Sequence, residues 1–132
     1  MQWRRVKSIV EYALFLPINL LARRLSFRSA GRVGAVLGGS AYRFTGYRKS
    51  VCIDNLTRAF PGKTHEEIER ISLGAYRGYG RALMEMLWSG GASADELIET
   101  MRLANKEVPL GALERGRGLI LLSGHFGAWE FI

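Results

Sequence analysis

Residues 118–130 decide the fold and read Gly-Leu-Ile-Leu-Leu-Ser-Gly-His-Phe-Gly-Ala-Trp-Glu. The run at 118–123 is short, apolar and bounded by glycine, which is typical of a strand buried in a parallel sheet rather than of a helix. His125 follows the carboxyl end of this strand, where ligands bind in open α/β sheets. The stretch therefore predicts an α/β fold with a candidate site at His125.

Glu130 lies five positions after His125, and the pair is a candidate general base with its orienting acid. A helix that begins near Gly127 places Glu130 in its first turn, where it accepts a hydrogen bond from one imidazole nitrogen and leaves the other basic. The small residues Gly124 and Gly127 let a substrate approach the backbone. Such a histidine takes a proton from an attacking hydroxyl, which is acyl transfer without a covalent enzyme intermediate. The alternative is a buried loop histidine and a solvated glutamate.

Residues 124–130 resemble the signature block of the bacterial lipid A biosynthesis acyltransferases, the lauroyl and myristoyl transferase family, which has four residues between a His and an acid. Arg48 and the segment Asn-Leu-Thr-Arg-Ala-Phe-Pro at 55–61 are similar to further family motifs, and a helix carrying an acid near Glu85 also fits. The resemblance implies an O-acyltransferase with His125 as catalytic base and Glu130 as its partner.

The same resemblance implies an acyl carrier protein thioester as donor and a hydroxyl of a lipid A precursor or related glycolipid as acceptor. It also implies that the protein is located at the cytoplasmic face of the bacterial inner membrane. The residues that we expect to bind substrate are Gly124, Phe126, Gly127 and Trp129, and packing beneath the sheet is the alternative for the two aromatic residues. One departure is Ala128, where the family commonly has Asn, so a polar contact that bears on positioning or substrate choice is missing.

The positive charge is concentrated at the amino-terminal end. Residues 1–50 hold ten Lys or Arg and one acid, whereas residues 51–132 hold nine Lys or Arg and eleven acids, in a chain of net charge +7. The apolar segment 8–22 lies between basic residues and is interrupted by Glu11 and Pro17. A span takes about 20 apolar residues, so this segment suits a helix at an anionic membrane surface with snorkelling arginines. A single-pass anchor and a helix buried in a soluble core are the alternatives.

A second helix is expected over residues 29–44, where Gly34 and Gly38 allow close approach to the first helix in a hairpin. Further helices are expected at 47–60, at 64–89 and at 109–115, and a short strand at 100–104. The capping pairs Thr64 with Glu67 and Ser93 with Glu96 mark two helix starts. The positions expected in the core of the long helix are Ile68, Ile71, Ala75, Tyr79, Leu83, Met86 and Leu87.

No phosphate loop or dinucleotide fingerprint is found, so we expect neither a cofactor nor a metal. Cys52 is the only cysteine, which excludes a disulfide framework and a cysteine metal cluster. His65 stands beside Glu66 and Glu67 with no third ligand nearby in the sequence, which is typical of a solvated first helical turn. Ser123 lacks the Gly-x-Ser-x-Gly elbow of a serine nucleophile.

The chain ends two residues after Glu130, whereas family members are longer. A parallel strand must be paired and covered on both faces. We therefore expect a truncated enzyme that is mostly helical and inactive alone, with an amino-terminal helical part and the first strand or strands of an α/β acyltransferase domain. Its parts would be a basic membrane-associating hairpin at 1–46 and the start of the acyltransferase domain at 47–132.

Two other functions stay open. One is a catalytically inactive fragment that keeps its membrane-docking helices. The other is a small basic helical protein that binds nucleic acid, whose affinity would fall steeply with salt. We do not expect nucleic acid as a partner, because the arginines flank a hydrophobic segment and lack interleaved exposed aromatic residues.

Overall fold

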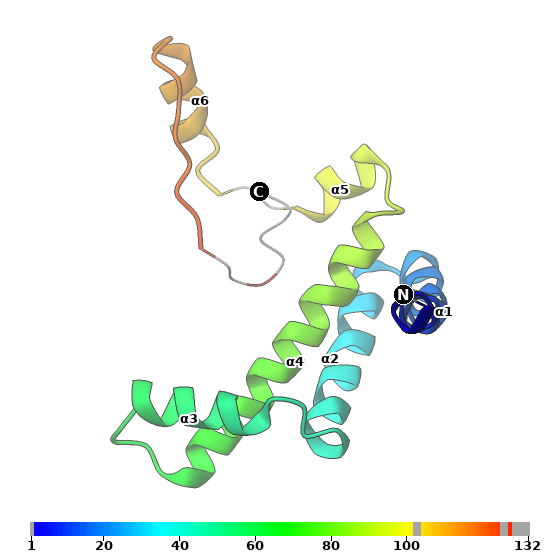
Figure 1. The fold of residues 1–132 in the computed structure, drawn as a ribbon. Helices are drawn as coiled ribbons and strands as arrows, with labels where there is room; N and C mark the ends of the chain where they lie inside the picture. Colours follow the sequence, from blue (N-terminus) through cyan, green and yellow to red (C-terminus); the bar gives the residue numbers. More distant parts are fainter. Residues whose placement is uncertain (1, 102–103, 125–126, 128–132) are drawn as a thin grey trace.

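The computed structural model describes the backbone of residues 2–101, 104–124 and 127, and their side chains except those of residues 2–11 and 14. The helices of this part of the chain are, in order, α1 (Gln2–Arg24), α2 (Phe27–Phe44), α3 (Lys49–Ala59), α4 (His65–Ser89), α5 (Ala94–Thr100) and α6 (Glu107–Glu114). Figure 1 shows α2 and α4 side by side, with α3 near the start of α4 and α5 beyond its end.

The long helix α4 is the element on which α1, α2 and α3 pack. It begins with a capping box, in which the Glu67 amide donates to Thr64 Oγ1 at 3.3 Å and the Thr64 amide donates to Glu67 Oε2 at 2.8 Å. It ends at Ser89, before Gly90 and Gly91. The expected helix over residues 64–89 is therefore confirmed.

Glycines bring α2 and α4 into backbone contact. A Cβ atom at Gly34 would overlap the carbonyl oxygen of Gly80, and one at Gly80 would lie 2.9 Å from the amide nitrogen of Gly38. The sequence predicted this close approach but with the wrong partner, because it assigned the glycine face of α2 to the first helix. The glycines face α4 instead, since α4 offers the matching Gly80 and α1 contains no glycine.

The apolar core lies near the carboxyl end of α4. Its buried members are Ala22 of α1, Ala30 of α2, and Met84, Leu87 and Trp88 of α4. The Phe27 ring meets Trp88 edge to face, with 5.3 Å between the ring centroids. The stem of Arg23 lies against Gly91, where a Cβ atom would come within 2.8 Å of Arg23 Cγ. These contacts hold α1 against the end of α4.

Polar and aromatic contacts join α2, α3 and α4 near the start of α4. Lys49 Nζ lies 3.0 Å from Glu69 Oε1 and 4.3 Å from the centre of the Tyr42 ring. The hydrogen bond from Lys49 lowers the pKa of the Glu69 carboxyl. The Ser72 hydroxyl donates to Cys52 Sγ at 3.2 Å. α3 is thereby fixed across α4.

Neither of the two expected strands is formed in the part of the chain that the structure describes. Residues 118–124 belong to no helix or strand, and Leu122 is fully exposed. A parallel strand forms only beside another strand, and the described residues contain none. Thr100, expected to begin a strand, ends α5. The mostly helical character is confirmed, whereas the α/β domain and the boundary at residue 46 stay predictions.

Candidate functional site

The candidate dyad follows the exposed segment 118–124. The residues His125, Phe126, Ala128, Trp129 and Glu130 lie outside the described residues, so their roles stay predictions. Gly124 and Gly127 are described, and both are exposed. Gly127 has a φ of 61°, in the left-handed region that glycine adopts readily.

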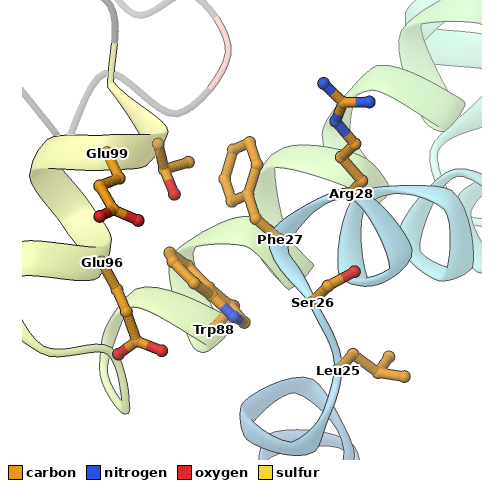
Figure 2. Close-up of a pocket in the computed structure, with 8 residues that line it drawn as sticks. Leu25, Ser26, Phe27, Arg28, Trp88, Glu96 and Glu99 are labelled. Carbon is orange, nitrogen blue, oxygen red and sulfur yellow. The ribbon is translucent and has the colours of Figure 1, made fainter.

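A cleft of about 660 Å³ opens between the α1–α2 turn and α5 (Figure 2). Its lining residues are Leu25, Ser26, Phe27, Arg28, Trp88, Glu96, Glu99 and Thr100. Figure 2 shows the two carboxylates on the α5 side of the aromatic pair and Arg28 on the other side. Hydrogen bonds from Ser93 lower the pKa of the Glu96 carboxyl. The lining contains charged and aromatic groups that can hold a ligand, but no histidine that could act as a base.

A second groove, of about 550 Å³, lies between the start of α3 and the middle of α4. It is lined by Tyr47, Arg48, Cys52, Ala75, Tyr76 and Tyr79. Arg48, singled out by the family resemblance, has a φ of 55°. This left-handed conformation is uncommon for a residue with a Cβ atom. The Tyr76 hydroxyl donates to the Tyr47 carbonyl oxygen across the groove wall.

The structure corrects part of the predicted core of α4. Ile68 and Leu87 are buried as expected and Ile71 is half-buried, but the other four expected core residues are exposed: Ala75, Tyr79, Leu83 and Met86. The periodicity of α4 correctly places these residues on an apolar face, yet it does not say how far along the helix a neighbour covers that face. No feature of the sequence indicates the groove, because its two walls come from residues 47–52 and 75–79, which are remote from each other in the sequence.

Glu85 is the acid that the resemblance placed on the long helix, and it lies on α4 at the contact with α2. A Cβ atom at Gly31 would come within 2.5 Å of Glu85 Oε1, so glycine leaves the space that the carboxylate fills. Burial raises the pKa of the Glu85 carboxyl, and the charge of Arg81 opposes this shift. The side chain is thus part of the α2–α4 interface.

The exposed apolar surface of α1 is the other candidate for binding. Tyr12 is 65% exposed and Leu20 is 56% exposed, and Arg23 and Arg24 follow at the end of the helix. None of the described helices has the length and hydropathy that a membrane crossing requires. The surface nevertheless has the composition of a helix that lies at an interface.

His65 and Cys52 occupy structural positions. His65 is exposed as the first residue of α4, and Cys52 accepts the hydrogen bond from Ser72 described above. Within the described residues, no group of three or more His, Cys, Asp or Glu side chains is arranged to hold a metal ion.

The comparisons with known proteins identify the family. Residues 4–132 match the family model described as bacterial lipid A biosynthesis acyltransferase. Neither a curated protein nor a solved structure matches the chain. The match covers all of the described helices from residue 4 onward and extends through the candidate dyad. The chain therefore belongs to the bacterial lipid A biosynthesis acyltransferase family.

Proposed function

We propose that the protein transfers a fatty acyl group from acyl carrier protein to a hydroxyl of a lipid A precursor or a related glycolipid. The observation that carries the proposal is the family match over residues 4–132, which includes both His125 and Glu130. Family membership implies an acyltransferase of lipid A biosynthesis. The donor, the acceptor group and the identity of the base are the proposed parts.

In the proposed reaction, His125 accepts the proton of the acceptor hydroxyl while its oxygen attacks the thioester carbonyl. Glu130 orients the imidazole and stabilises the imidazolium that forms. Collapse of the tetrahedral intermediate breaks the carbon–sulfur bond, and the imidazolium returns the proton to the leaving thiolate. The products are an ester of the acceptor and the free thiol of the carrier. No covalent enzyme intermediate and no cofactor take part.

We also propose that the protein acts at the cytoplasmic face of the inner membrane. The support is the exposed apolar surface of α1 together with the ten basic residues within residues 1–50. Anionic lipid attracts basic residues beside an apolar helix, and the same charge attracts an acidic carrier protein.

The test is acyl transfer from labelled acyl carrier protein to a lipid A precursor in detergent, with this chain and with a version extended to the length of family members. We expect His125→Ala to lower the rate by about 10²- to 10⁴-fold, the usual contribution of a general base. The matched control is His65→Ala, which removes the other histidine of the chain at an exposed helix start. This control should keep the wild-type rate.

Two outcomes would overturn the proposal. Equal rates for His125→Ala and the wild type would exclude His125 as the base. Absence of transfer in the wild type, with vesicle binding retained, would favour a membrane-docking module without catalysis. The pH dependence of the rate tests the base assignment separately. A wild-type rate that rises as the pH is raised through about 6.5 would support His125 as the base if this rise is absent in His125→Ala.

A further inference from the structure

A stretch of the sequence without acidic residues includes the second half of α1, all of α2 and the start of α3. Residues 12–53 contain seven Lys or Arg and neither Asp nor Glu. The surface that this stretch forms is therefore positively charged, and it attracts an anionic partner.

Within this stretch, α2 exposes large apolar side chains on the side that is turned away from α4. Val36 is 68% exposed, Leu37 is 47% exposed and Phe44 is 85% exposed. Gly34 meets α4, and Val36 follows two positions later, about 200° around the helix. Leu37 and Phe44 are seven positions apart and form the row beside Val36. Contact with α4 therefore leaves this apolar surface open.

Two arginines lie on the same surface. Arg32 is four positions before Val36 and Arg43 is seven positions after it, so these three residues form one row along the helix. Both arginines are exposed. Arginine beside an apolar surface lays its aliphatic stem on that surface and keeps the guanidinium in a polar layer. The two rows together, here named the α2 outer face, consist of Arg32, Val36, Leu37, Arg43 and Phe44, which is the composition of a helix that lies at a membrane surface.

The arrangement of α1 and α2 favours a flat partner. The two helices are joined by only Leu25 and Ser26. Figure 1 shows α1 nearly along its axis and α2 from the side, with α1 and α4 on opposite sides of α2. Two helices that meet at an angle define a plane, so a lipid surface can contact the exposed apolar residues of both at once. A folded acidic protein has no such flat surface to offer to two crossed helices.

We propose that the α2 outer face lies on an anionic membrane surface beside α1. The inference rests on the proposed membrane location and adds a second contact to it. The apolar side chains enter the boundary between headgroups and acyl chains, and the arginines bind lipid phosphates. With α1 alone the molecule could rotate about the axis of this helix, whereas contact through α2 fixes which side of the protein faces the lipid.

Fluorescent labelling at single cysteines tests the contact in the whole protein, with Cys52→Ser as the background. A polarity-sensitive label is attached to Val36→Cys, and the matched control is Ile98→Cys on α5, because Val36 is 68% and Ile98 69% exposed. With phosphatidylglycerol vesicles we expect the emission at Val36→Cys to shift to shorter wavelength. Nitroxide-labelled lipid should quench it about threefold more than the emission at Ile98→Cys.

Three results would overturn the inference, and they differ in what they say of the proposed location. Vesicle binding with equal lipid quenching at the two positions would exclude α2 but leave the membrane location in place. Absence of vesicle binding by the wild type would overturn the location together with the second contact. A label at Val36→Cys that responds to acyl carrier protein in solution and not to vesicles would assign the α2 outer face to an acidic protein.

Charge substitution gives an independent readout. Arg32→Gln combined with Arg43→Gln should lower partitioning into phosphatidylglycerol vesicles about 30-fold, since each basic residue near anionic lipid contributes about fivefold. The matched control is Arg58→Gln combined with Arg70→Gln, which removes the same charge from exposed positions outside residues 12–53. This control should lower partitioning by less than about threefold, because charges farther from the lipid are screened. An equal decrease for both pairs, with helix content retained, would contradict the contact through α2.

Discussion

At the scale of single residues, the close contact between α2 and α4 requires glycine where the two backbones meet. Gly80→Ala places a methyl group against backbone atoms of Gly34 and Gly38, which cannot move as a side chain can. We expect a loss of about 1–3 kcal/mol in the free energy of unfolding, the usual cost of overpacking. Gly74→Ala on the same helix meets nothing within 4 Å and should stabilise by about 0.5–1 kcal/mol. Urea denaturation measures both, and equal midpoints would contradict the contact.

Glu85 predicts a pH dependence of stability at the same interface. Burial raises the pKa of the Glu85 carboxyl in the folded state. The contribution of this carboxyl to the free energy of unfolding is therefore fully present below its ordinary pKa and is lost as the pH rises through the raised pKa. Glu85→Gln keeps the shape without the charge. We expect its stability relative to wild type to improve between pH 4 and pH 7. Denaturation at both pH values tests this, and a constant difference in stability between the variant and the wild type would argue against a raised pKa of the half-buried Glu85 carboxyl.

At the scale of elements, removal of either of two similar capping boxes should affect the stability of the fold differently. Thr64→Ala weakens the start of α4, on which α1, α2 and α3 pack, and should lower the stability of the whole fold by about 1 kcal/mol. Ser93→Ala removes the equivalent bond from α5. We expect faster hydrogen exchange within α5 but almost the same unfolding midpoint. A similar decrease in the unfolding midpoint of both variants would show that α5 unfolds together with α4.

At the scale of the whole molecule, the concentration of basic charge in the first 50 residues predicts preference for anionic lipid. The protein should float with vesicles of phosphatidylglycerol more than with vesicles of phosphatidylcholine, and added salt should reduce the difference. Replacement of Leu20 and Leu21 by Glu should reduce binding, because both side chains are exposed on α1. Ile98→Glu on α5, where Ile98 is 69% exposed, is the matched control. Equal binding of all variants would exclude α1 as the docking helix.

The sequence alone determined the starts of α4 and α5 and the end of α4, whereas α1, α2 and α6 begin earlier than the expected segments 8–22, 29–44 and 109–115. The Thr64–Glu67 and Ser93–Glu96 boxes and the glycines after Ser89 and Glu114 are local signals, because a cap needs only residues three or four positions away. The family motifs were also readable from residue types and spacing, and the family match confirms the assignment that they suggested.

Only the tertiary structure decided which faces meet. The sequence shows a glycine face on α2, but the partner is α4 because Gly80 lies opposite. The sequence shows an apolar face on α4, but only the structure shows that Ile68 on this face is buried whereas Tyr79 is exposed. A strand over residues 118–123 depends in the same way on a neighbouring strand. Periodicity reports the chemistry of one surface, whereas packing also requires a second surface, which is remote in the sequence and has to match it in shape.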